Sequence, residues 1–348
     1  MADSALNPSL ENRGQASSRL DGVVALLSKG LHLMGSLRTT LVILLLLGAG
    51  VIWLIYYPAQ ATRVLILPFG LLALNLSAAI LVHPVFRTRM GLLVFHLSLL
   101  AIILLVVIGR LTYLKGWAEV SQGAAFNGQL TGYEAGPWHP WHLEEAIFVN
   151  QAFEINYAAG PRRTHTYNRV GWVEAGGLKQ SLIGDQTPLV LAGYRFYTSF
   201  NKGFAPLFSW RPRGADQAIT GDLHLPAYPA NEHRQTAEWT PPGSDRPLWF
   251  LLAFEEEILS AERPSVFHPP SEHRLILRAG EERYELQPGE TLALAQGSLT
   301  YHALRTWMGY TVHYDWTRPW LVAACLMAIF GLSWHLWERF FRTPWLRD

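Results

Sequence analysis

The sequence is poor in cysteine and in charge, and each shortage excludes a class of function. Its one cysteine, Cys325, lies within an apolar run. A single cysteine cannot form an internal disulfide, a CxxC motif or a cysteine metal cluster, which excludes thiol–disulfide exchange as the chemistry. Charged residues make up 16% of the chain and the formal net charge is +1. A near-neutral chain lacks the basic footprint of a nucleic-acid-binding protein.

Catalytic signatures are also missing. The sequence contains no convincing nucleophile elbow, phosphate-binding loop, HExxH motif or carboxylate pair. This absence argues against a hydrolase or an ATP-driven pump. We therefore assign no catalytic residue from the sequence.

Apolar residues are abundant, at half of the chain, and they are concentrated in four runs. Each run reaches or approaches the ~20 residues that a membrane-spanning helix needs. The runs are Leu41 to Tyr57, Val64 to Val82, Gly91 to Gly109 and Trp320 to Trp337. We expect an N-terminal tail (residues 1–36), transmembrane helices 1–3 (37–111), an outer domain (112–318), transmembrane helix 4 (319–338) and a C-terminal tail (339–348).

The distribution of Lys and Arg predicts the orientation, because cytoplasmic loops carry an excess of these residues. Eight lie near the span ends on one side: Arg19, Lys29, Arg38, Arg87, Arg89, Arg339, Arg342 and Arg347. Four lie on the other side: Arg63, Arg110, Lys115 and Arg318. We expect a multi-pass membrane protein, with both termini in the cytoplasm and the large domain outside.

The domain between the third and fourth spans has the pattern of short strands. Alternating segments separated by Gly and Pro turns indicate an antiparallel sandwich or open barrel. The clearest are Ala146–Tyr157, Leu189–Phe200, His273–Leu286 and Tyr310–Tyr314, while Ser209 to Pro247 has the composition of a long loop. The predicted fold class is thus a membrane α-helical protein with four helices, 3+1, plus an exported mainly-β domain.

Two histidines lie inside predicted spans, where an ionisable residue is a functional candidate by default. His96 is in the third span and His335 in the fourth, both toward the cytoplasmic ends and at similar depth. A neutral imidazole there can be an axial ligand of heme iron. The alternatives are a His96 that bonds a Ser, an Asn or a backbone carbonyl on the next helix, such as Asn75, and a His335 that reaches the interface.

The outer domain holds nine further histidines, and the sequence does not select one of them as a heme contact. They are His139, His142, His165, His224, His233, His268, His273, His302 and His313. His139 and His142 lie three apart among prolines and tryptophans, which is weak as a metal motif.

Four stretches resemble the ResB/CcsB family of cytochrome c biogenesis proteins, known as system II. They are Gly35 to Leu41 before the first span, Gly91 to Gly109 with His96, Trp117–Gly123 (WAEVSQG) after the third span, and Thr306–Gly331 leading into the fourth. The resemblance covers the ends of the chain well and its middle loosely. Asp315-Trp316-Thr317 departs from the Asp-Pro-Gly that the family often has.

The resemblance implies a function in cytochrome c maturation at the bacterial inner membrane. A family member moves heme b outward as cargo and presents it for attachment to apocytochrome c. It would be a non-autonomous subunit of a holocytochrome c synthase, acting with a CcsA/ResC-type membrane protein and with a thiol-reducing partner as a further candidate. The family's third-helix heme ligand matches His96. The tryptophan-rich motif of the partner is absent from this chain.

Two other functions compete with this one. The first is a membrane-anchored scaffold whose β-rich domain binds a protein, without heme and with a packed His96. The second is a transporter or sensor subunit, which is weakened because His96 and Asn75 offer too little internal polarity for an ion pathway.

Overall fold

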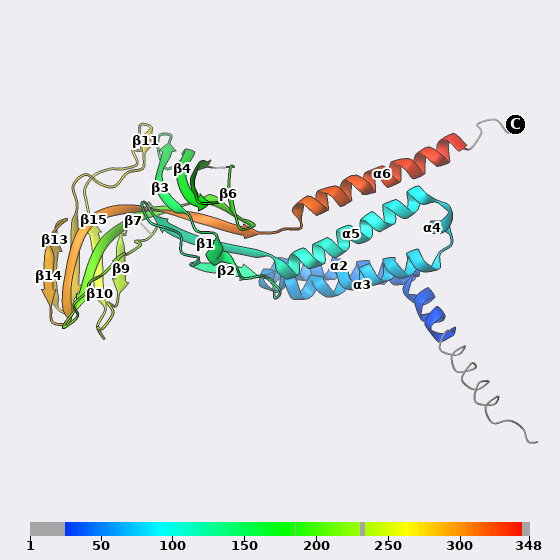
Figure 1. Ribbon diagram of the computed structural model, residues 1–348, viewed down its shortest axis with the longest axis horizontal. Coiled ribbons are helices and arrows are strands. Elements are labelled where there is room, and N and C mark those ends of the chain that lie inside the picture. The colour runs from blue at the N-terminus through cyan, green and yellow to red at the C-terminus, as the bar shows by residue number, and fades with distance from the viewer. Residues whose placement is uncertain (1–24, 185, 230–233, 343–348) are drawn as a thin grey trace, which may run out of the picture. The chain divides into compact units, whose positions relative to one another are not determined.

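The computed structural model describes residues 25–184, 186–229 and 234–342 (Figure 1). The chain divides into two compact units. One holds the long helices, and the other consists of Leu114–Ala135 and His139–Tyr314. The predicted N-terminal tail lies mostly outside the described residues, and a helical segment covers residues 25–34.

Four helices of the helical unit are long and apolar enough to cross a membrane. They are α2 (Leu37–Tyr56), α3 (Ala61–Val82), α5 (Met90–Thr112) and α6 (Arg318–Arg342). Two short pieces connect them: η1 (Pro58–Gln60) joins α2 to α3, and α4 (Val85–Thr88) joins α3 to α5. The four predicted spans are confirmed, and they mark the chain as a multi-pass membrane protein.

Small residues bring neighbouring helices into backbone contact. A Cβ built on Gly91 of α5 would lie 2.6 Å from the backbone nitrogen of His335, and one built on Gly331 of α6 would lie 2.6 Å from that of Phe95. Glycine at such positions is typical of membrane helices, which associate by close packing. These two contacts show that α5 and α6 run antiparallel and fix their register.

The strand unit consists of three open sheets in which every pairing is antiparallel. The first has the order β2-β1-β15-β7-β6, with β14 beside β15 and β8 beside β7; the others have the orders β11-β3-β4-β5 and β13-β12-β10-β9. The first sheet comprises β1 (Leu114–Ser121), β2 (Gly132–Ala135), β6 (Leu189–Leu191), β7 (Tyr194–Pro212), β8 (Ile219–Asp222), β14 (Thr291–Leu294) and β15 (Gly297–Tyr314). The second sheet comprises β3 (Val149–Tyr157), β4 (Arg163–Glu174), β5 (Gly177–Gly184) and β11 (Ser265–Val266). The third comprises β9 (Thr236–Trp239), β10 (Leu248–Ala253), β12 (Arg274–Ala279) and β13 (Glu282–Leu286). The predicted fold class is confirmed.

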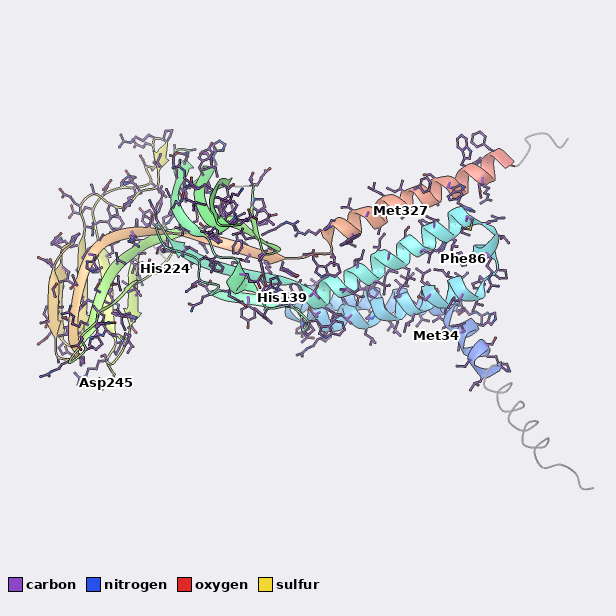
Figure 2. The ribbon with its side chains drawn as sticks, in the orientation of Figure 1. Met34, Phe86, His139, His224, Asp245 and Met327 are labelled. Carbon is purple, nitrogen blue, oxygen red and sulfur yellow. The ribbon has the colours of Figure 1, made fainter. Side chains whose placement is uncertain are left out.

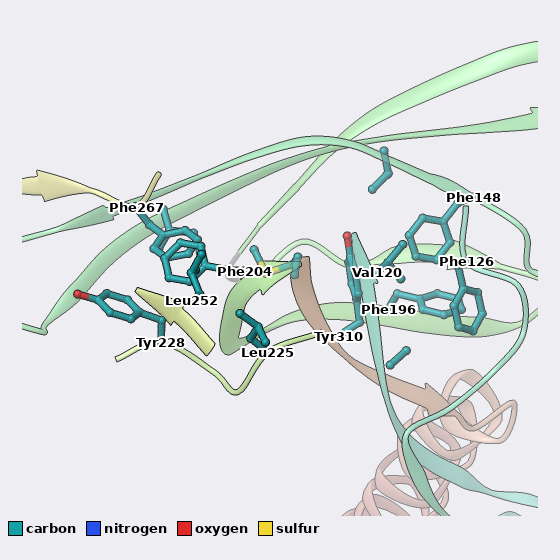
Figure 3. Close-up of a cluster of buried hydrophobic side chains, with 14 of the residues drawn as sticks. Val120, Phe126, Phe148, Phe196, Phe204, Leu225, Tyr228, Leu252, Phe267 and Tyr310 are labelled. Atoms are coloured by element: carbon teal, nitrogen blue, oxygen red, sulfur yellow. The ribbon is translucent and has the colours of Figure 1, made fainter. Parts of the chain in front are cut away.

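Aromatic rings dominate the core of the strand unit (Figure 3). In one group Phe148 lies 5.0 Å from Phe196, measured between ring centroids, and Phe126 packs against both. In a second group Phe204 stacks on Phe267 at 5.4 Å. Aromatic side chains bury large apolar areas, so these two groups account for much of the burial that holds the sheets together.

The segment expected to be a long loop, Ser209 to Pro247, contains more structure than its composition indicated. It begins with the end of β7 and includes β8 and β9. Both added strands are four residues long, too short for an alternating pattern to stand out between prolines and glycines. The loop prediction was therefore wrong for these parts.

Lys202 is buried among these aromatic rings. It is 3% exposed, and its Nζ lies 4.8 Å from the ring centroid of Tyr157 and 5.5 Å from that of Phe267. Burial, helped by the nearby charge of Arg163, lowers the pKa of Lys202 from 10.5 to about 8. The folded chain therefore holds this proton less tightly than the unfolded chain. The contribution of Lys202 to the free energy of unfolding is lowest below pH 8 and rises from pH 8 to 10.5.

Replacing Lys202 with methionine is expected to stabilise the protein at pH 7. Methionine keeps the apolar stem and removes a buried charge, and the pKa shift corresponds to a gain of at most about 3 kcal/mol. Thermal unfolding of the detergent-solubilised chain, measured from pH 7 to 10, should show a higher midpoint and a smaller rise with pH. The exposed Lys179 gives the control variant Lys179→Met, which should behave as the parent does.

Candidate functional site in the membrane helices

His96 lies on α5, half-buried against two phenylalanines. Its ring meets Phe86 of α4 edge-on at 4.7 Å and Phe95 at 5.2 Å, measured between centroids. Its Nδ1 lies 2.8 Å from the backbone oxygen of Leu92, one helical turn earlier. A carbonyl oxygen can only accept, so Nδ1 carries the proton and donates it.

This hydrogen bond fixes the state of the other ring nitrogen. In the neutral imidazole, Nε2 then has the lone pair. Within the part of the chain that the structure describes, nothing hydrogen-bonds Nε2. The atom is also not fully buried. Histidines that bind metals typically donate their second N–H to a carboxylate or a backbone carbonyl. His96 has this arrangement, with its unshared electron pair at the surface of the helical unit.

His335 is on α6, whose register with α5 places it level with Gly91. His96 lies five residues further along α5, which is about 7 Å along the helix axis. The sequence indicated similar depth for the two histidines, and the register separates them by roughly one helical turn. The Nδ1 atom of His335 is buried without a hydrogen-bond partner among the described residues.

Asn75 does not bond His96, contrary to one of the alternatives. Its side-chain oxygen accepts from the Thr40 hydroxyl at 2.8 Å, and its NH₂ group donates to the backbone oxygens of Met34 and Ser36. Ser36 is also the N-cap of α2, accepting from the backbone N–H of Thr39. Asn75 thus satisfies the polar groups at the start of α2, a structural task that explains its burial.

The outer histidines are spread over the strand unit, and no group of three or more metal-binding side chains occurs among the described residues. His139 Nε2 lies 2.9 Å from the Tyr194 hydroxyl, and His142 Nε2 lies 3.1 Å from the oxygen of Ala192. The His273 ring bonds the Tyr301 hydroxyl at 2.7 Å, and burial lowers the pKa of His273. His233 lies outside the described residues.

Sequence reasoning missed one cluster of chemically active groups. His224 lies 3.0 Å through Nδ1 from a carboxylate oxygen of Glu119, and 2.9 Å through Nε2 from the Ser121 hydroxyl. Glu119 and Ser121 are two apart on β1, so they share one face of the strand. The histidine is about one hundred residues away in the sequence, and no local motif signals the cluster.

Comparison with known proteins adds little to this description. No family model matches the sequence, and no curated protein matches it. A solved chain described as "Cytochrome c Heme Lyase CcmF" is similar with a TM-score of 0.27 and 15% identity, over 93% of this chain and 40% of that one. The chain thus spans less than half the length of that protein. At this TM-score the likeness supports no conclusion about function, and membership of the ResB/CcsB family stays a prediction.

Proposed function

We propose that this chain is the membrane subunit of a heme-delivery complex for cytochrome c maturation, and that His96 Nε2 is an axial ligand of the heme it handles. One observation carries the proposal. His96 donates its Nδ1 proton to Leu92 inside a membrane helix, which leaves Nε2 as a free electron-pair donor. Heme b is the cargo, and the share of this chain is ligation and orientation.

The setting of His96 favours ligation over simple packing. An imidazole nitrogen without a hydrogen bond is costly in a bilayer, where water cannot satisfy it. A packed histidine would be expected to use both nitrogens within the protein. Phe86 and Phe95 both pack edge-on against the ring, which limits its rotation.

The proposal includes a membrane partner. Most of the surface of α2 and α6 is exposed in the isolated chain, so other helices or lipid must cover it. A CcsA/ResC-type protein would cover part of this surface and supply the remaining heme ligands, and apocytochrome c would accept the heme. The proposed orientation keeps both termini in the cytoplasm and the strand unit outside, as the Lys and Arg counts predict.

Replacing His96 with glycine tests the ligand assignment. In the complex purified from membranes in mild detergent, we expect a six-coordinate Soret band that weakens or shifts in His96→Gly, because one iron ligand is lost. Added imidazole should restore the parent spectrum by occupying the vacated position. His83→Ala is the matched control and should keep the spectrum, because the His83 ring already contacts the backbone oxygen of Gly35 through Nε2.

A His96→Gly complex with unchanged heme content and spectrum would contradict the ligand assignment. Complexes without heme in any preparation, with normal covalent c-type cytochromes in a strain lacking this chain, would contradict the whole proposal. That result would favour the scaffold function instead.

A further inference from the structure

We propose that Ser121, His224 and Glu119 form a second functional site, a nucleophilic serine that reacts with small carboxylic esters. A carboxylate accepts from one imidazole nitrogen, and the other imidazole nitrogen accepts from a serine hydroxyl. The two contacts measure 3.0 Å and 2.9 Å, within hydrogen-bond range. This is the order of groups that activates serine in acyl-transfer enzymes, where geometry and role define the site and sequence order does not.

The imidazole is held in place by its surroundings. His224, labelled in Figure 2, stacks on the indole of Trp307 with centroids 5.5 Å apart and planes 21° apart. The Trp307 N–H in turn donates to the backbone oxygen of the next residue, Leu225, at 3.0 Å. The indole of Trp307 on β15, a strand distant in the sequence, therefore holds the imidazole ring beside β1, as a general base requires.

The three groups open into a cavity of about 300 Å³. Ser121 is among the residues that line this cavity and is 1% exposed as a whole residue, while the Glu119 and His224 side chains are 28% and 25% exposed. The cavity is at the lower end of the ~300–1,000 Å³ usual for ligand sites, which limits the substrate to a small acyl group.

Donors for the carbonyl oxygen of an ester come from side chains. The backbone N–H of Gln122, directly after the serine, already donates to Thr306 at 2.8 Å. Asn127 and Gln129 line the same cavity. The oxygen of Asn127 accepts the Gln129 N–H at 3.1 Å, so the NH₂ group is what Asn127 has left to offer a substrate oxygen.

The reaction balances with water as the second substrate. The Ser121 hydroxyl oxygen attacks the acyl carbon while His224 Nε2 takes its proton. Collapse of the tetrahedral intermediate breaks the bond to the alcohol, which leaves with the proton from Nε2. Water then attacks the acyl-serine with Nε2 again as base, and the acid and free serine are released.

Labelling with diisopropyl fluorophosphate tests the site in the full-length chain in detergent. The hydroxyl oxygen displaces fluoride from phosphorus, and mass spectrometry of the peptide containing Ser121 detects the product. We expect one label per chain at Ser121, a loss of about 100-fold or more in labelling rate for His224→Gln, and a smaller loss for Glu119→Gln. Hydrolysis of p-nitrophenyl acetate should fall in parallel.

The chain supplies a matched control. Ser209 lies 2.6 Å from His302 Nε2 and 2.8 Å from the Thr220 hydroxyl, and among the described residues no carboxylate contacts this histidine. Ser209→Ala should leave labelling unchanged. Circular dichroism and thermal melting confirm that each variant is folded, and Glu119→Gln replaces His224→Gln as the test if His224→Gln does not fold. A parent chain that is not labelled, or folded Glu119→Gln and His224→Gln variants that label at the parent's rate, would overturn the proposal.

Discussion

Replacing Gly331 with leucine is expected to lower the stability of the helical unit by about 3 kcal/mol, the upper end of what overpacking usually costs. Even a single added carbon at this position would lie 2.6 Å from the backbone nitrogen of Phe95 and 3.0 Å from its Cα. Backbone atoms of a helix cannot swing aside as a side-chain end can. Helices α5 and α6 must therefore separate or shift in register.

The effect should appear as a lower midpoint of thermal unfolding in detergent. Gly70→Leu is the matched control, because a Cβ built on Gly70 of α3 has nothing within 4 Å apart from its chain neighbours and the nearby backbone of its own helix. Leucine also has the higher helix propensity, by up to ~1 kcal/mol in water, so this control should be neutral or slightly stabilising. If both variants melt together, α5 and α6 are not in contact at Gly331.

This contact also bears on the proposed heme site. Phe95, which Gly331 approaches, packs edge-on against His96. A shift of α6 would therefore loosen one of the two rings that hold the imidazole. Gly331→Leu should weaken heme binding and lower stability by about 3 kcal/mol. The His96→Gly variant should weaken heme binding with a smaller loss of stability, because it clashes with no backbone and gives up two ring contacts and some helix propensity.

The helices could be predicted from the sequence, but their register could not. Length and apolar content are enough to identify a membrane span, and all four were identified. Gly91 and Gly331 resemble any other glycine in a span. Their role depends on which helices touch, and α5 and α6 are separated in the sequence by the whole strand unit.

Strand prediction was limited by irregular pairing. β15 was expected only from Tyr310 to Tyr314, but it runs from Gly297 to Tyr314. Its register with β7 shifts at Tyr301/Ala303 and at Met308/Tyr310. The first shift leaves one extra residue on β15, which reverses the alternation of inward and outward side chains there. The second skips one residue of β15 against three of β7, so the pairing is interrupted again. Hairpin β12–β13 has no such shift, and the sequence indicated it as one region, His273–Leu286.

The two candidate sites differ in how far the sequence reveals them. His96 stands out because an ionisable residue in an apolar run is rare, although its protonation at Nδ1 required the structure. Ser121 and Glu119 are ordinary residues of an alternating strand. Their partner His224 follows β8, within the segment interpreted as a loop, so nothing local connected the three.

The largest loss of stability in the strand unit is expected for Asn168→Ala, at about 4 kcal/mol. Asn168 is fully buried, and each of its side-chain hydrogen-bonding groups is used. Its NH₂ group donates to the Asn150 side-chain oxygen at 2.7 Å and to the Ala152 backbone oxygen at 3.0 Å, and its own oxygen accepts from the Tyr310 hydroxyl at 2.7 Å. Removing it deprives the buried Asn150 oxygen and Tyr310 hydroxyl of this partner, at about 1–3 kcal/mol each before any relaxation, and takes one hydrogen bond from the part-buried Ala152 oxygen.

These bonds join two sheets, because Asn150 and Asn168 are on β3 and β4 while Tyr310 is on β15. Asn150 also donates to the Val120 oxygen at 2.9 Å, next to Ser121 on β1.

Thermal unfolding of Asn168→Ala should be compared with that of Asn156→Ala. Among the described residues, the Asn156 side-chain amide bonds only the exposed side chain of Glu154, so this control should cost less than ~1 kcal/mol. Tyr310→Phe should fall between them, and the double variant should cost less than the sum, since both changes break the same bond. Additive costs would mean that Asn168 and Tyr310 stabilise the fold independently. A folded Asn168→Ala variant should also label more slowly at Ser121, because the strand that carries the serine has lost the support of its neighbouring sheet.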